Sequence, residues 1–212
     1  MRFLVLLVVV AACVVVAAEL VVPPRIEEEV EARVVAEVPE ARSVEVEVGS
    51  FPVVARGLAT GELQRLVVVL DEVAHPEITV DRIQVELVGI DVSRRALLTG
   101  DVELQAVDRG ELWAVISEAD LEDALPGGVV DLELTAGRAE ASVAGQTVGS
   151  DVVVADGALV FDLGRLPNLT VPLPGPELFP CPLQGEVVEG AVRLGCTLDQ
   201  VPDYLLRRLD GG

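Results

Sequence analysis

Residues of the types that catalysis needs are scarce in this sequence. The chain has one histidine, His75, which precedes Pro76 between two predicted strands, and its basic residues are all arginine. Without a second histidine or a lysine, a serine or cysteine nucleophile lacks its usual base. A lone histidine does not make a metal site, and the sequence has no glycine-rich nucleotide loop. We therefore expect a protein that is not an enzyme and that holds no metal or cofactor.

Carboxylates are the one abundant reactive group, since 36 acidic against 15 basic residues give a formal net charge of −21. A facing pair of carboxylates could hydrolyse a glycosidic bond. Most of them, however, alternate with apolar residues along predicted strands, where they are solvated. Asp120, Glu122 and Asp123 crowd a predicted short helix, where charge near the helix start is ordinary. The negative field repels phosphate backbones, so nucleic acid is not an expected partner.

Two of the three cysteines flank a predicted hairpin. Its strands are Leu183–Val188 and Ala191–Cys196, and Glu189-Gly190 forms the turn. Folding this hairpin brings Cys181 close to Cys196, and an oxidising compartment would favour a disulfide between them. The alternative is a pair of buried free thiols.

The N-terminal segment is apolar from Phe3 to Val22 except for Glu19. A stretch of about 20 residues is what a helix needs to cross a bilayer. We expect residues 1–22 to be a membrane anchor that Pro23-Pro24 ends, with the rest of the chain outside the cytoplasm. Two alternatives stay open: a cleaved signal peptide, and a lipoprotein acylated at Cys13.

The rest of the chain, residues 23–212, is predicted to be a single α+β domain. An apolar residue recurs every four positions from Ile26 to Val38, which predicts an amphipathic helix from Pro24 to Val38. From Val44 on, apolar and polar residues alternate between short turns, which predicts an antiparallel meander. Ser117 can cap a short helix within it. A long meander curls, so we expect a curled antiparallel sheet wrapped against the N-terminal helix, a tubular half-barrel.

The alternating strands predict where a ligand could bind. Each has an apolar face opposite an acidic one, and the single apolar stripe of the N-terminal helix is too narrow to cover the whole inner surface. The uncovered part would be a groove for acyl chains, because burying a methylene group gains about 0.8 kcal/mol. The alternative is that these residues are ordinary core. The predicted lipid-binding residues are Phe51, Val85, Leu87, Val102, Leu104, Trp113, Leu132 and Leu134.

The order of several short motifs resembles the LmeA-like phospholipid-binding family of high-GC Gram-positive bacteria. The likeness covers most of the chain after the N-terminal segment. The motifs are Gly49-Ser50-Phe51-Pro52, Gly61, Gly89-Ile90-Asp91-Val92, Pro172-Leu173-Pro174, Cys181-Pro182-Leu183, Leu194-Gly195-Cys196-Thr197-Leu198 and Val201-Pro202.

The resemblance implies an envelope protein that binds phospholipids, has a fold similar to tubular lipid-binding domains and is linked to lipoglycan assembly. The strong acidity departs from a generic lipid carrier and disfavours recognition of anionic head groups. We therefore predict non-enzymatic, extracytoplasmic binding of phospholipid acyl chains. A membrane-tethered structural or interaction module without a ligand cavity is the alternative.

Overall fold

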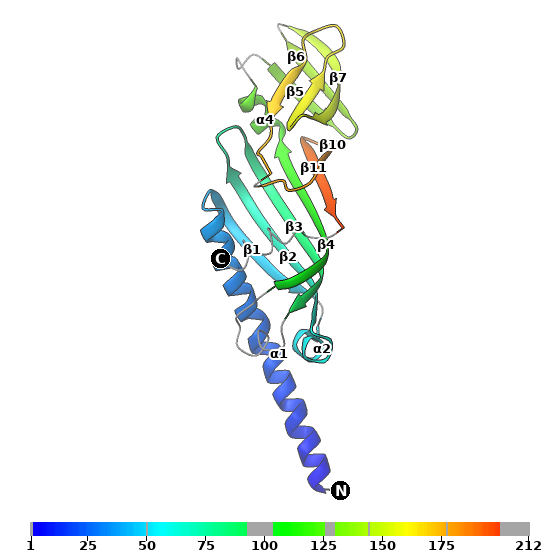
Figure 1. Cartoon of the computed structure of the whole chain (residues 1–212). Coiled ribbons are helices and arrows are strands. Elements are labelled where there is room, and N and C mark those ends of the chain that lie inside the picture. Colours follow the sequence, from blue (N-terminus) through cyan, green and yellow to red (C-terminus); the bar gives the residue numbers. More distant parts are fainter. Residues whose placement is uncertain are drawn as a thin grey trace.

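The computed structural model describes residues 2–49, 51–92, 104–125, 130–143, 145–176 and 178–199. A strongly curled antiparallel sheet and a smaller antiparallel sheet lie end to end, and a long N-terminal helix runs beside the larger one (Figure 1). The predicted fold class, α+β with a curled antiparallel sheet against an N-terminal helix, is confirmed.

In the five longer strands of the larger sheet, valine, isoleucine and leucine dominate one face, and these side chains suit a pleated surface. Its strand order is β1-β2-β3-β4-β11-β10, and every neighbouring pair is antiparallel. The strands are β1 (Ala41–Gly49), β2 (Glu62–Ala74), β3 (Thr79–Val92), β4 (Leu104–Ser117), β10 (Gln184–Val188) and β11 (Ala191–Leu198).

The smaller sheet is a separate meander in the order β5-β6-β7-β8-β9. The sequence suggested one continuous meander, and this is wrong at β4, whose second neighbour is β11 rather than β5. The reason is helix α4 (Glu118–Ala124), which redirects the chain after β4. The strands of this sheet are β5 (Val130–Thr135), β6 (Arg138–Val143), β7 (Gln146–Ala155), β8 (Ala158–Asp162) and β9 (Leu169–Pro172).

Helix α4 fixes the edge of the smaller sheet. The Ser117 side chain accepts a hydrogen bond from the Asp120 N–H, which confirms the predicted cap. Glu118 and Glu122, one turn apart on α4, accept the N–H groups of Leu134 and Leu132 at 2.7 and 2.6 Å. These carboxylates satisfy donors that an edge strand would otherwise leave open.

The two sheets are joined through the β10–β11 hairpin. The Gly190 N–H donates to the Leu134 carbonyl at 2.8 Å, and the Gly137 N–H donates to the Val187 carbonyl at 2.9 Å. Gly185 allows close approach, because a Cβ there would lie 3.3 Å from a methyl group of Val154.

Helix α1 runs unbroken from Arg2 to Glu37 and contains Pro23 and Pro24. The prediction that a new helix begins at Pro23-Pro24 is therefore wrong. A proline keeps a helical φ, but it removes its own N–H and crowds the carbonyl four residues earlier, which here are the carbonyls of Glu19 and Leu20. Leu20 is exposed, so water can reach this side of the helix. In the part of α1 whose side chains the structure describes, from Val16 on, and in the other described helices, no stretch is long and apolar enough to cross a membrane.

One buried carboxylate joins α1 to helix α2 (Val53–Thr60). The two carboxylate oxygens of Glu19 accept the N–H groups of Val53 and Ala55 at 2.8 and 2.9 Å. Both donors lie in the first turn of α2, which has no side-chain cap of its own. Glu19 thus supplies the negative charge that the start of a helix favours.

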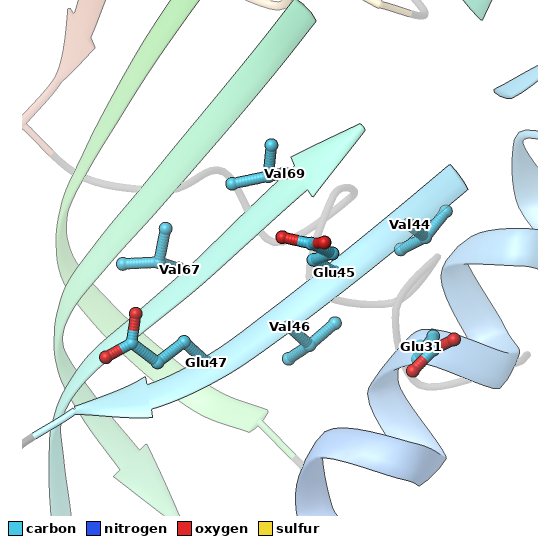
Figure 2. Close-up of a pocket in the computed structure, with 7 residues that line it drawn as sticks. All are labelled: Glu31, Val44, Glu45, Val46, Glu47, Val67 and Val69. Atoms are coloured by element: carbon cyan, nitrogen blue, oxygen red, sulfur yellow. The ribbon is translucent and has the colours of Figure 1, made fainter. Parts of the chain in front are cut away.

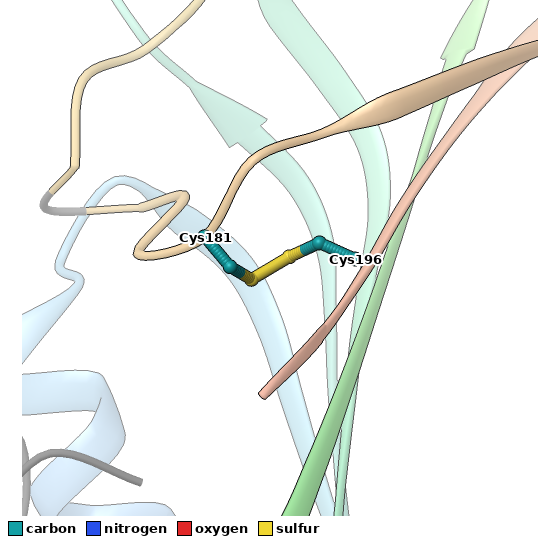
Figure 3. The surroundings of a disulfide bond; sticks show 2 residues. All are labelled: Cys181 and Cys196. Atoms are coloured by element: carbon teal, nitrogen blue, oxygen red, sulfur yellow. A yellow bond between two sulfur atoms is a disulfide. The ribbon is translucent and has the colours of Figure 1, made fainter. Parts of the chain in front are cut away.

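The C-terminal hairpin forms as predicted, with Val188 paired to Ala191 across the turn. Cys181 lies in the loop before β10 and is disulfide-bonded to Cys196 on β11, with the two Cα atoms 6.0 Å apart (Figure 3). The predicted disulfide is confirmed. It ties this loop to the larger sheet, where Phe179 and Leu173 are also buried.

Replacing Glu19 by alanine should lower the free energy of unfolding by about 1–3 kcal/mol, because two N–H groups at the start of α2 lose their acceptor. Glu19→Gln keeps one acceptor oxygen and should lose less. The control is Glu28→Ala, which removes the same charge from an exposed position of α1. Urea unfolding of the full chain in detergent, followed by circular dichroism, measures the difference. Equal losses in the Glu19→Ala and Glu28→Ala variants would contradict the capping role.

Breaking the disulfide by Cys181→Ser with Cys196→Ser should cost roughly 3 kcal/mol, the chain-entropy value for a loop of this size. Thiol labelling of the unfolded chain checks the bond directly. Without reductant only Cys13 should react, and after reduction all three cysteines should react. Three reactive thiols before reduction would show that the bond is absent.

Candidate functional site

The register of the larger sheet aligns apolar side chains in three rows across one face, the helix-side face. Figure 2 shows Val44 and Val46 on the side of β1 that faces α1, with Glu45 and Glu47 on the other side. The upper row is Val44, Leu70, Ile83, Ala114 and Leu194; the middle row is Val46, Val68, Val85, Leu112 and Cys196; the lower row is Val48, Leu66, Leu87, Gly110 and Leu198.

The middle row is the least covered part of this face. All five residues of the upper row are buried, which makes it ordinary core. Among the residues of the three rows that lie on β2, β3 and β4, Val85 is the one that is partly exposed. Its neighbours in the row, Val68 and Leu112, are 8% and 6% exposed. Val46, which belongs to the same row and lies on the edge strand β1, is also partly exposed. An aliphatic surface open at the centre of a dry face is suited to an apolar ligand.

The opposite face of the sheet mixes charged residues with apolar ones such as Val67, Val88 and Trp113, and it carries cross-strand ion pairs. Arg65 donates two hydrogen bonds to Glu86, at 2.6 and 3.0 Å, and Arg82 donates to Asp71 at 2.8 Å. Hydrogen bonds from Arg65 hold the pKa of Glu86 below its ordinary value; desolvation opposes this shift, and the charge of Arg65 adds to it. Both arginines therefore already have acidic partners on this face.

A pocket of about 500 Å³ opens at the β1 edge of the sheet, a volume in the range of small-molecule sites. Figure 2 shows its lining, which combines valines with carboxylates and contains no basic residue. Such a lining suits an aliphatic chain and repels an anionic group. The lining residues are Glu31, Val44, Glu45, Val46, Glu47, Val67 and Val69.

Two of the predicted lipid-binding residues lie together on the helix-side face. Val85 is in the middle row, and Leu87 is beside it in the lower row, 8% exposed. Leu104 begins β4, and Val102 lies outside the described residues.

The other predicted residues lie elsewhere. Trp113 is on β4 but on the opposite face, paired with Gln84, and is 41% exposed. Phe51 precedes α2 and is almost fully exposed. Leu132 and Leu134 are buried in β5 of the smaller sheet. The structure therefore brings Val85 and Leu87 together and places Phe51, Trp113, Leu132 and Leu134 elsewhere.

Sequence reasoning missed several residues of the middle row and the pocket. Val46, Val68, Leu112 and Cys196 belong to the row. Val46 and Cys196 lie on alternating segments, which give the face of a strand but not its register with the next strand. Val68 and Leu112 lie in continuous apolar runs, where the sequence does not even give the face. Helix α2 was also missed, although Pro52 just before it and Gly61 just after it are typical of helix ends.

The carboxylates of α4 have structural partners. Asp81 accepts the Ser117 N–H at 2.6 Å, beside Asp120. Burial raises the pKa of Asp120; the Ser117 hydroxyl hydrogen bond lowers it, and Asp81 raises it further. In the described part of the chain, no group of three His, Cys, Asp or Glu residues could hold a metal ion.

A family model described as LmeA-like phospholipid-binding matches residues 16–200. This chain belongs to the LmeA-like phospholipid-binding family. The match begins inside α1 and includes every described strand of both sheets. No curated protein and no solved structure matches the chain. The LmeA-like family is described by the lipid it binds and not by a reaction, which agrees with a face of aliphatic side chains.

Glu86→Gln should lower the free energy of unfolding at pH 7, because it removes the charge that Arg65 stabilises. The pKa of Glu86 is depressed in the folded state, so this contribution is present above the unfolded pKa of about 4.3 and is lost as pH falls through the folded value. The difference between parent and variant should therefore shrink below about pH 4. Urea unfolding at pH 7 and at acidic pH tests it, with exposed Glu133→Gln as the control. A difference that does not change with pH would contradict the assignment.

Proposed function

We propose that this LmeA-like protein binds phospholipid without catalysis, outside the cytoplasm, by holding acyl chains against the middle row of the helix-side face. The observation that carries this proposal is the partial exposure of Val85 on a central strand, between the buried aliphatic residues Val68 and Leu112. A phospholipid has two apolar chains, and each methylene group removed from water gains about 0.8 kcal/mol.

The acyl chains, and not the head group, would provide the affinity. The chain carries a net charge of −21, and three glutamates line the pocket at the β1 edge. The arginines nearest to the pocket on β2 and β3, Arg65 and Arg82, are paired with Glu86 and Asp71. A phosphate group would therefore remain in solvent, where water screens its charge.

The site of action would be the cell envelope. The chain has a Cys181–Cys196 disulfide. Disulfides persist in oxidising compartments and are rare in cytosolic proteins. Residues 3–22 would anchor the protein in the membrane, because their sequence contains one acidic residue among apolar ones, and Arg2 favours a cytoplasmic N-terminus. From there the protein would hold or pass phospholipids used in envelope lipid or lipoglycan assembly.

Val85→Glu should abolish lipid capture with little effect on folding, since the position is partly exposed but lies between buried aliphatic residues. The lipid-bound fraction should fall about tenfold or more, because an acyl chain would have to bury an unpaired charge. Val85→Phe fills the same space without a charge and should also weaken capture. Native mass spectrometry of the full chain released from detergent micelles measures the bound lipid.

The matched control is Val88→Glu on the same strand. Val88 is on the opposite face, exposed, and paired with Arg65 and Arg109, which can accommodate a new carboxylate. This variant should capture as much lipid as the parent. If a folded Val85→Glu protein also captures lipid normally, the ligand does not lie on the middle row. If the parent captures none, the protein is the structural module that was the alternative.

A further inference from the structure

Five exposed apolar side chains gather where α1 leaves the domain. They lie on two segments, the middle of α1 and the start and outer side of α2, which are next to each other at one end of the larger sheet (Figure 1). Phe51 is 81% exposed and Leu20 is 72% exposed. We call this group the end patch: Val16, Leu20, Val21, Phe51 and Leu58.

Glu19 holds the two parts of the end patch together. Its buried carboxylate binds the first turn of α2, so its neighbour Leu20 and the residue Phe51, two positions before Val53, belong to one rigid unit. The exposure of these side chains is therefore a property of the folded molecule. Exposed apolar side chains on two neighbouring elements that are held together in this way indicate an interaction surface.

We propose that the end patch rests in the interfacial layer of the membrane in which α1 is anchored. This inference depends on the proposed tether. Helix α1 is unbroken from Arg2 onwards, and the run from Phe3 to Leu20 spans about 26 Å at 1.5 Å per residue, close to the hydrocarbon thickness of a bilayer. Leu20 and Val21 then lie at the level of the head groups, and Phe51 and Leu58 lie beside them.

The charges on the two segments of the end patch do not oppose a lipid surface. Glu19 is buried, so the remaining charged residues of segments 16–26 and 51–60 are Arg25, which is exposed, and Arg56, which is partly buried. Both are positive, in a chain with a net charge of −21. The acidic run of α1 begins at Glu27, which lies seven residues after Leu20, about 10 Å along the helix at 1.5 Å per residue. These two segments are therefore less acidic than the rest of the chain, and exposed Glu62 is the acidic residue that follows α2.

This placement orients the binding face. Glu31 at the pocket follows Leu20 by eleven residues on the same helix, about 16 Å at 1.5 Å per residue. The pocket would stand just above the head groups with the smaller sheet pointing away from the membrane (Figure 1). A lipid leaving the outer leaflet would cross little water before it met the valines of β1.

Quenching by brominated acyl chains tests the placement. The full chain is reconstituted in phosphatidylcholine vesicles with or without bromine on the acyl chains, and each variant adds one tryptophan to native Trp113. In the Phe51→Trp protein, more than half of the added fluorescence should be lost in brominated vesicles. Val35→Trp, which is exposed further along α1, and Val153→Trp, which is exposed on β7, should be quenched no more than the parent.

Vesicle flotation and lipid capture separate the possible failures. If the chain floats with vesicles and Phe51→Trp is not quenched, the end patch contacts something other than the bilayer and the proposal is wrong. Equal quenching of Val153→Trp would also overturn it, since the domain would then lie flat on the membrane. Failure to float would remove both the tether and the patch proposal. Lipid capture by the same preparations decides the binding function independently.

Discussion

The constraint on which this structure depends is the register of its larger sheet. Side chains alternate between faces with a period of two, so a slip of one residue in any strand would move that strand's valines and leucines to the opposite face. The pairing of Val46, Val68, Val85 and Leu112 is what brings residues of four separate strands into one aliphatic row. The ion pairs Arg65–Glu86 and Arg82–Asp71 on the other face join β2 to β3 in this same register. A slip between these strands would break both pairs.

The two ends of this sheet are held by different contacts. At one end, Glu19 and α2 close the sheet onto α1 and leave aliphatic groups outside. At the other, the hairpin of β10 and β11 belongs to the larger sheet and also contacts the smaller one through main-chain hydrogen bonds. The disulfide holds the preceding loop against β11. The aliphatic row thus lies between two ends that are each fixed by specific polar or covalent contacts.

Sequence patterns predicted the elements better than their assembly. Alternation located most strands, and Ser117 correctly marked the start of α4. The same alternation could not tell Val85 from Leu132, because both are apolar residues opposite an acidic face, yet they lie in different sheets. Which strand pairs with β4 depends on contacts between residues some 80 positions apart, such as Ala114 with Leu194. Local sequence contains no information on that choice.

The prolines misled the prediction in another way. Pro23 and Pro24 are strong helix-ending signals in isolation, but Ile26 beyond them is 2% exposed and Glu19 before them is buried, so packing on both sides favours helix. In contrast, Pro52 and Gly61 do mark the two ends of α2. The helix was still missed because it is short and mostly apolar, so its sequence shows no clear helical periodicity. Val46 and Cys196 could be named as members of the row only once the strands were paired.

The unbroken helix also has a consequence for how the chain can change in length. Glu19 and Ile26 are seven residues apart, nearly two turns at 3.6 residues per turn, so both project from the same side of α1. Inserting or deleting one residue between them would rotate one against the other by about 100° and separate the α2 bond from the core contact. Homologous chains should therefore keep the number of residues between these positions constant, whereas exposed turns such as Gly145 should tolerate extra residues.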